Sequence, residues 1–226
     1  MKHVMKTSIL KFCQILSRRL FYILALHIQM EKQFGSSKAI WRKQSIDRNG
    51  NPIPWLTYPS IDYLSSFNFS GKTVLEFGSG NSTLWWENTG AIVTSIEHDE
   101  YWYTKMLSQV NSANIILEKG SNYDLYLEDP SKKFQIIIVD GGDRVSAGKA
   151  AVLHLQRNGG GLLILDNSNW YDDLVSYIDK NLQYTRVDFH GFAPLNDYKS
   201  VTSIWLSANL MKDLAHNSKS KWIPET

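Results

Sequence analysis

The chain has 226 residues, of which 43% are hydrophobic and 20% are charged; this composition is typical of a soluble globular protein and excludes a largely disordered one. The formal net charge of +2 is too balanced to indicate a nucleic-acid-binding protein, so we expect no nucleic-acid partner. Cys13 is the only cysteine, which excludes a disulfide framework and a cysteine-based zinc site and fits a reducing, cytoplasmic compartment.

The N-terminal segment contains an apolar helix pattern. Hydrophobic residues recur at helical spacing through the segment, and from Leu20 to Ile28 both faces are apolar. Arg18 and Arg19 interrupt the run, which is too short to span a bilayer. Three interpretations stay open: a helix packed on the domain or on a second subunit, a membrane-surface helix, and an uncleaved anchor. We place this helix and a linker at residues 1–50, one domain at 51–208 and a tail at 209–226.

A glycine-rich turn follows the first strand pattern, at residues 73–77. The sequence Glu76–Gly80 reads Glu-Phe-Gly-Ser-Gly, and its glycines allow the backbone to approach a ligand. Strand, glycine turn and helix N-terminus together form a nucleotide-binding geometry. Thr83 stands where a dinucleotide-binding motif has its third glycine, and Glu76 would repel a pyrophosphate but attract an ammonium group. The residues expected at this site are Glu76, Gly78, Ser79, Gly80 and the helix N-cap candidates Asn81 and Ser82.

A second acid follows the next strand pattern, at residues 91–96. Glu97 comes 21 residues after Glu76, which is where a ribose-binding carboxylate falls in a βαβ nucleotide-binding unit. His98 is next to it and is included among the expected cofactor contacts. A helix is predicted at residues 101–110 and a third strand at 114–118.

The rest of the chain continues to alternate between strands and helices. The apolar run at 134–139 is typical of a central parallel strand covered on both faces. Helices are predicted at 147–156 and 170–182, a strand at 162–165, and two final strands at 184–189 and 200–206. This spacing predicts a parallel α/β sheet with right-handed crossovers.

These features resemble the class I, Rossmann-like S-adenosylmethionine-dependent methyltransferases, over residues 55–206. The resemblance implies a seven-stranded, mostly parallel sheet with a C-terminal antiparallel strand pair, helices on both faces, and here an added N-terminal helical extension. It also implies that Glu76 and the glycine backbone hold the amino acid end of S-adenosylmethionine, and that Glu97 accepts the ribose hydroxyls. Asn122 and Tyr123 occupy the loop where the family commonly contacts adenine.

Asp140, Asp166 and Asn167 end two strands that we expect to be neighbours. Three oxygen donors at one sheet edge suit Mg²⁺ or another hard divalent cation, and the set resembles that of the cation-dependent small-molecule O-methyltransferases. Those enzymes have a general-base lysine three residues after the first aspartate, where this chain has Asp143 followed by Arg144. A metal site and a purely structural role for these residues therefore both stay open.

The methyl acceptor is not readable from the sequence. O-methylation of a small molecule or of a glycan- or lipid-linked acceptor is expected from the resemblance, with Asp140 and His190 as candidate catalytic residues; a loop histidine is also commonly plain surface. Peripheral membrane contact or a homodimer through the N-terminal helix is a further expectation. The alternatives are a catalytically inactive cofactor-binding scaffold and an NAD(P)-dependent oxidoreductase. Trp55, Tyr58, Trp170 and Phe192 are the aromatic residues expected to frame an acceptor.

Overall fold

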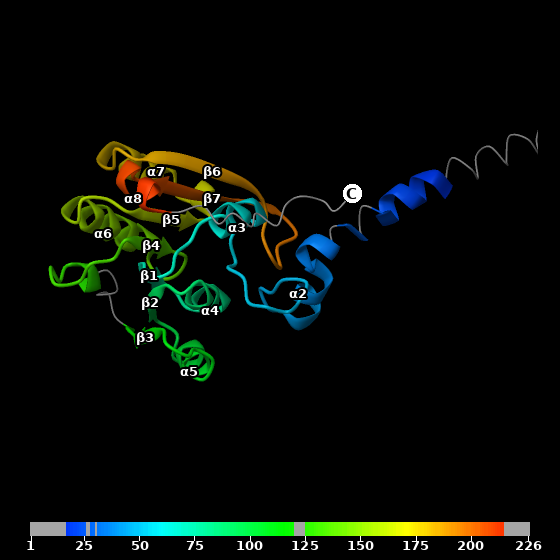
Figure 1. Cartoon of the computed structure of the whole chain (residues 1–226), viewed down its shortest axis with the longest axis horizontal. Coiled ribbons are helices and arrows are strands. Elements are labelled where there is room, and N and C mark those ends of the chain that lie inside the picture. Colours follow the sequence, from blue (N-terminus) through cyan, green and yellow to red (C-terminus); the bar gives the residue numbers. More distant parts are fainter. Residues whose placement is uncertain (1–16, 26–27, 30, 120–124, 215–226) are drawn as a thin grey trace, which may run out of the picture.

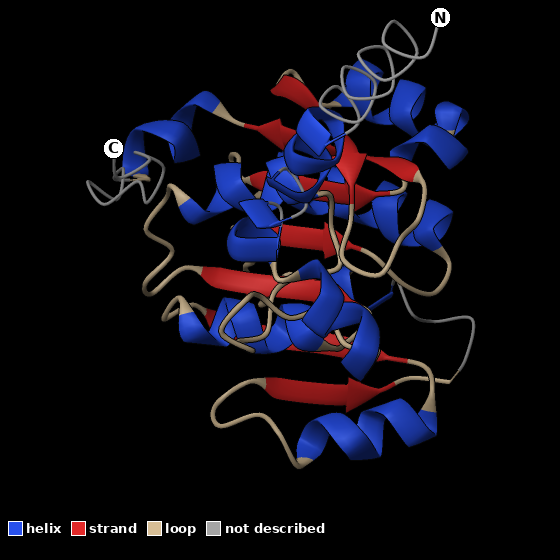
Figure 2. Cartoon of the chain, turned by 90° about the vertical axis from the view of Figure 1, so that its right-hand side faces the viewer, coloured by secondary structure: helices blue, strands red, loops and turns tan. Residues whose placement is uncertain are grey.

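The computed structural model describes residues 17–25, 28–29, 31–119 and 125–214. Its centre is a seven-stranded sheet with the order β3-β2-β1-β4-β5-β7-β6, and helices cover both faces (Figures 1 and 2). Strands β1 to β5 are parallel, and β7 runs antiparallel between β5 and β6. The strands are β1 (Thr73–Phe77), β2 (Ile92–Glu97), β3 (Asn114–Leu117), β4 (Ile136–Val139), β5 (Leu162–Asp166), β6 (Thr185–Phe192) and β7 (Lys199–Leu206).

The predicted fold class is confirmed, because the sheet has seven strands, five of them parallel, and closes with an antiparallel pair beside β5. Residues 17–25 are also helical. Among the described residues, no helix combines the length and the apolar character needed to cross a membrane. The helices are α2 (Ser36–Arg42), α3 (Tyr58–Ser65), α4 (Asn81–Asn88), α5 (Glu100–Leu107), η1 (Leu125–Leu127), α6 (Arg144–Arg157), η2 (Ser168–Trp170), α7 (Asp172–Asn181) and α8 (Ala208–Asp213).

Two hydrophobic cores lie on opposite faces of the sheet. Successive strand residues point to opposite faces, so in β1 Leu75 and Phe77 pack in the core with α6 and α7, whereas Val74 packs in the core with α3, α4 and α8. The four residues of β4 are all buried, as expected of a strand covered on both sides. This double burial fixes the register of the strands, and with it the positions of the polar residues at their ends.

The final hairpin is longer than the sequence predicted. Strand pairing between β6 and β7 continues as far as Phe192 opposite Lys199, so the connecting loop spans only residues 193–198. His190, expected in that loop, lies instead within β6 and pairs with Val201. The physical reason is that backbone hydrogen bonding between β6 and β7 continues beyond the apolar residues from which the two strands were predicted.

The segment before α3 is attached to the domain. Ile46 and Pro52 form an isolated β-bridge, and the Asn81 side-chain amide donates to the Ser45 carbonyl oxygen at 2.7 Å. The Phe34 ring packs on the Tyr58 ring with their centroids 4.3 Å apart. Residues 34–58 are therefore held against the start of α4 and α3.

Candidate functional site

Four acidic residues stand at the carboxyl edge of the sheet. Glu76, Glu97 and Asp166 are in the last two positions of β1, β2 and β5, and Asp140 directly follows β4. Ligands of open α/β sheets bind outside this edge. All four residues line one cavity of about 700 Å³. Its other lining residues include Gly78, Ser79, Gly80, Asn81, Ser82, His98, Trp102, Arg144, Asn167 and, at the rim, Lys43, Trp55, Leu195, Asn196 and Tyr198.

Glu76 is the most buried of these acids, with 1% of its surface exposed. Its Oε2 accepts hydrogen bonds from Thr83 Oγ1 at 2.5 Å and Ser95 Oγ at 3.0 Å. Within the described part of the chain, its Oε1 is buried without a hydrogen-bond partner. Burial raises the pKa of Glu76 from 4.5 to about 7, since desolvation disfavours the charged form. The hydroxyl groups of Ser82, Thr83 and Ser95 oppose this rise in pKa. A cationic ligand group would satisfy Oε1 and favour the carboxylate.

The glycine turn brings two backbone segments into close contact. Gly78 has φ 103°, a left-handed conformation that favours glycine. A Cβ on Gly141 would lie 3.0 Å from Gly78 Cα and 3.2 Å from the Phe77 carbonyl oxygen. The turns after β1 and β4 are therefore packed backbone to backbone, and both Gly78 and Gly141 line the cavity.

The prediction that Asn81 or Ser82 caps α4 is wrong. Gly80 is the N-cap and provides no side-chain cap, and Asn81 is the first helical residue. The Gly80 N–H instead donates to Thr83 Oγ1 at 3.0 Å. Thr83 in turn donates to Glu76. Thr83, which stands where a dinucleotide-binding motif has its third glycine, therefore connects the glycine turn to the buried carboxylate.

Glu97 is buried and its carboxylate is already hydrogen-bonded. Its Oε2 accepts from Ser79 N at 2.9 Å and from Ser79 Oγ at 2.8 Å. Its Oε1 accepts from the N–H groups of His98 and Asp99 at 2.8 and 2.9 Å. Ribose hydroxyls would therefore have to replace the Ser79 hydroxyl, the one of these donors that can rotate away without moving the backbone.

Trp102 is a site residue that sequence reasoning missed. Asp99 caps α5 by accepting from Trp102 N at 2.7 Å, which fixes the start of the helix. From there the Trp102 indole donates to the Ser79 carbonyl oxygen. A Cβ on Gly80 would lie 3.6 Å from Trp102 Nε1, so the indole borders the glycine turn. The available signal was an aromatic residue in the first helical turn after the second acid. Asn122 and Tyr123, the predicted adenine contacts, lie outside the described residues.

The predicted metal ligands are brought together, but a guanidinium group lies among them. Arg144 Nη2 donates to Asp140 Oδ1 at 3.0 Å, and Arg144 Nη1 donates to Asn167 Oδ1 at 2.8 Å and to the Asp166 carbonyl oxygen at 2.6 Å. The Asp166 carboxylate turns to another partner, accepting from Thr202 Oγ1 at 2.7 Å. Arg144 thus supplies the positive charge that a divalent cation was expected to supply.

These residues do not fit a divalent metal as they stand. Two of the three expected donor oxygens, on Asp140 and Asn167, already accept hydrogen bonds from Arg144, and a metal could reach them only by displacing a cation. Among the described residues, there is also no cluster of three or more His, Cys, Asp or Glu side chains suited to a metal. The metal expectation is therefore corrected to an arginine-centred cluster.

The two aspartates of this cluster have perturbed acidity. Burial, together with the nearby Asp166 charge, raises the pKa of Asp140 well above its ordinary value, although Arg144 opposes the shift. Burial likewise raises the pKa of Asp166 to about 6. Carboxylates held in this way accept protons more readily than exposed ones.

Part of the rim of the cavity comes from two segments that are distant in the sequence. Trp55 Nε1 donates to Asn196 Oδ1 at 3.0 Å, which joins the segment before α3 to the loop between β6 and β7. Trp55 is 48% exposed and Tyr198 is 47% exposed, so aromatic surface is available to a ligand. Of the four aromatic residues predicted to frame an acceptor, only Trp55 lines the cavity. His190 is exposed on β6 and is not among the lining residues.

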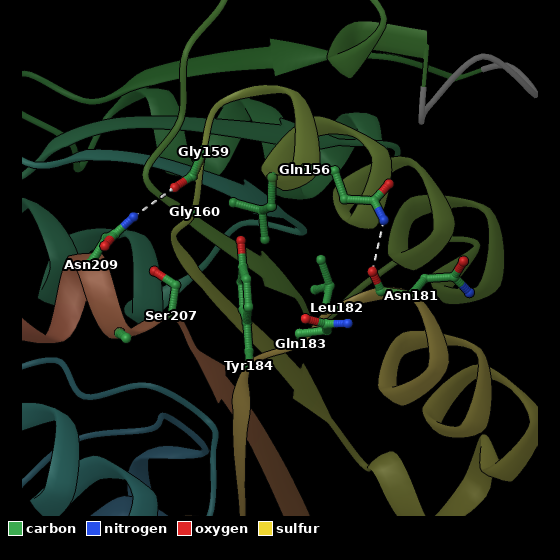
Figure 3. Close-up of a pocket in the computed structure, with 11 residues that line it drawn as sticks. Gln156, Gly159, Gly160, Asn181, Leu182, Gln183, Tyr184, Ser207 and Asn209 are labelled. Atoms are coloured by element: carbon green, nitrogen blue, oxygen red, sulfur yellow. Dashed lines mark hydrogen bonds between the residues drawn. The ribbon is translucent and has the colours of Figure 1, made fainter.

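A second hollow, of about 300 Å³, lies at the other edge of the sheet (Figure 3). Gln156 Nε2 donates to the Asn181 carbonyl oxygen at 2.7 Å, and Asn209 Nδ2 donates to that of Gly159 at 3.3 Å. Its lining contains no acidic or basic side chain. The larger cavity at the carboxyl edge is therefore the candidate site.

No family model matches the sequence, and no curated protein matches it. Solved structures do match. An rRNA methylase from Streptococcus thermophilus is 18% identical, over 66% of this chain and 95% of its own, with a TM-score of 0.48. The magnesium protoporphyrin IX methyltransferase from Synechocystis PCC 6803, with bound S-adenosylmethionine, is 13% identical over 66% and 76%, with a TM-score of 0.45. A methyltransferase from Pyrococcus furiosus is 19% identical over 84% and 98%, with a TM-score of 0.42.

Proposed function

We propose that the chain is an S-adenosylmethionine-dependent methyltransferase. The observation that carries the proposal is Glu76 Oε1, a buried carboxylate oxygen that lacks a hydrogen-bond partner among the described residues and belongs to a residue lining the cavity. An unsatisfied buried carboxylate is costly unless a cation pairs with it. The α-ammonium group of S-adenosylmethionine is such a cation, whereas a pyrophosphate would be repelled.

The residues around Glu76 fit the rest of this cofactor. Gly78 and Gly80 line the cavity beside it, and Glu97 would accept the ribose hydroxyls once the Ser79 hydroxyl rotates away. Trp102 offers an aromatic surface beside the same turn. When bound, the cofactor supplies an electrophilic sulfonium methyl group. The protein's part is to hold the reactants in line and exclude water, an effect that can lower a barrier by about 7 kcal/mol or more.

We propose that the acceptor enters between the Arg144 cluster and the rim formed by Trp55, Asn196 and Tyr198. Exposed aromatic rings beside an amide suit a planar phenol or a sugar ring, so O-methylation of a small molecule or a glycan is the favoured reaction. Asp140 lines this part of the cavity, and its raised pKa suits it to accept the hydroxyl proton. Arg144 would hold Asp140 in place and neutralise the charge that remains.

The proposal is tested by comparing two adenosine ligands. S-adenosylhomocysteine carries the amino acid end, whereas methylthioadenosine lacks it. We expect the first ligand to bind much more tightly, and Glu76→Gln to remove most of that difference. Equal affinity of the two ligands for the unmodified protein would contradict the role of Glu76. Asp173→Asn, an exposed acid in α7, is the matched control and should leave both affinities unchanged.

A further inference from the structure

Charge is divided unevenly along the chain. Residues 1–50 contain ten lysines and arginines and two acidic residues, whereas residues 51–226 contain fourteen basic and twenty acidic residues. The overall charge of +2 therefore combines an N-terminal segment of +8 with a remainder of −6. Such an asymmetry is typical of a segment that binds an anionic surface.

The same segment exposes a continuous apolar surface. Residues 17–25 are helical, and in Figure 1 this helix projects away from the sheet. Every side chain from Leu20 to Leu24 is between 51% and 70% exposed. Large apolar side chains exposed together mark an interaction surface. No described part of the domain covers them, so packing on the domain, one of the expectations from the sequence, does not explain this helix.

The residues that follow the exposed helix are held in place by hydrogen bonds. Glu31 Oε2 accepts from Ser37 N at 2.8 Å, and Arg48 Nη1 donates to the Lys32 carbonyl oxygen at 3.0 Å. In α2, which follows, Trp41 is 87% exposed. Exposed tryptophan and basic residues are typical of proteins at a membrane interface.

We infer that Arg18–Leu24, together with Trp41, docks on the surface of a bilayer that contains anionic lipid. Anionic headgroups complement the +8 charge of the segment, and the acyl boundary accepts the apolar side chains. A second copy of the chain is a poorer partner, because two segments of like charge would repel each other. A nucleic acid would match the charge but leave Leu20–Leu24 in water.

This surface is connected to the candidate site. Lys43 is the C-cap of α2 and lines the rim of the cavity. Helix α2 therefore extends from the proposed membrane-contacting segment to the rim of the cavity. The inference itself rests on charge and exposure alone, and does not depend on the proposed methyl transfer.

The test is co-sedimentation of the full-length protein with vesicles. One set contains phosphatidylcholine alone, and in the other phosphatidylserine replaces about a third of it, enough to give a negative surface potential. We expect binding to the second set, weakened by added salt. Phe21→Ser with Ile23→Ser should lower the partition coefficient roughly tenfold or more. Arg18→Gln with Arg19→Gln should lower it by a similar factor and reduce the dependence on salt.

Matched control variants distinguish membrane binding by this segment from a general effect of lost apolar surface or positive charge. Leu153→Ser removes an exposed leucine from α6, and Lys180→Gln with Lys212→Gln removes two exposed charges outside the segment; both variants should bind vesicles as the unmodified protein does. S-adenosylhomocysteine binding by every variant reports separately on the cofactor site. The inference would be overturned by equal binding to both sets of vesicles, by no binding, or by equal losses in the control variants. Dimerisation that depends on Phe21 and Ile23 in light scattering, without vesicle binding, would also overturn it.

Discussion

Arg144 and Asp140 form an ion pair at the start of α6, with Nη2 3.0 Å from Oδ1. The same guanidinium group hydrogen-bonds Asn167, so one side chain connects the ends of β4 and β5. The side of the cavity on which we propose that the acceptor enters is thus built around a fixed cation that belongs to the protein. Removal of that cation should expose two carboxylates of raised pKa to each other.

Arg144→Ala should lower the free energy of unfolding by about 3–5 kcal/mol, because it leaves buried charge uncompensated. The loss should be smaller in acid, where Asp140 and Asp166 become protonated. Mg²⁺ should restore part of the stability of this variant only, since the donor oxygens are then free. Urea unfolding in EDTA and in Mg²⁺ measures both effects. Arg157→Ala is the control, because Arg157 donates only to backbone carbonyls; a Mg²⁺ effect on the unmodified protein would contradict the arginine-centred cluster.

Cofactor affinity should depend on pH through Glu76. Its pKa in the free protein is about 7, and only the carboxylate attracts the ammonium group, so S-adenosylhomocysteine should bind more tightly as the pH rises through 7. The stability of the unliganded protein changes in the opposite direction. A folded-state pKa above the ordinary value of 4.5 means that this group favours folding in acid and loses that contribution as the pH rises towards 7. Glu76→Gln should flatten both profiles, and a variant that kept them would show that another group titrates.

Glu97→Ala should weaken S-adenosylhomocysteine binding by roughly ten- to a hundredfold, the size expected for loss of hydrogen bonds to a charged group. The circular dichroism spectrum should stay that of a folded protein. Glu128→Ala, an exposed acid near the end of η1, provides the control. Unchanged affinity in the Glu97 variant would remove Glu97 from the ribose role.

Gly141→Ala, in the turn after β4, should disturb the glycine turn after β1. The new Cβ would meet Gly78 Cα at 3.0 Å, and relieving that contact should cost about 1–3 kcal/mol of stability and shift the Gly78 backbone. Cofactor affinity should fall as well, although Gly141 carries no ligand-binding side chain. In Gly159→Ala the new Cβ meets no atom within 4 Å, so any loss of stability in that variant comes from the positive φ of Gly159, which Gly141 does not share, and not from a packed neighbour. Equal effects on cofactor affinity in the two variants would argue against the packed turn.

The sequence was sufficient to predict the sheet and the four acids at its edge. Strand patterns and glycine turns are local signals, and parallel pairing then brings Glu76, Glu97, Asp140 and Asp166 to the same edge without further information. The boundaries of β6 were missed because strand pairing, which is not local, extends that strand beyond its apolar residues. The position of His190 within a strand follows from the same extension.

The side-chain partners could not be predicted in this way. The spacing of Asp140, Asp166 and Asn167 is the same whether a metal or a guanidinium group lies among them, and only the path of the Arg144 side chain distinguishes the two. Trp102 and Asn196 reach the site from neighbouring elements through single hydrogen bonds. Such contacts depend on rotamers and loop paths, which leave no pattern in the sequence.

The central claim is tested most directly by calorimetric titration of the protein with S-adenosylhomocysteine, first in EDTA and then in Mg²⁺, followed by titration with NADH. We predict saturable binding of S-adenosylhomocysteine with the same affinity in both buffers, and no heat of binding with NADH. Heat from NADH in the absence of any S-adenosylhomocysteine binding would contradict the account and assign the cavity to a dinucleotide.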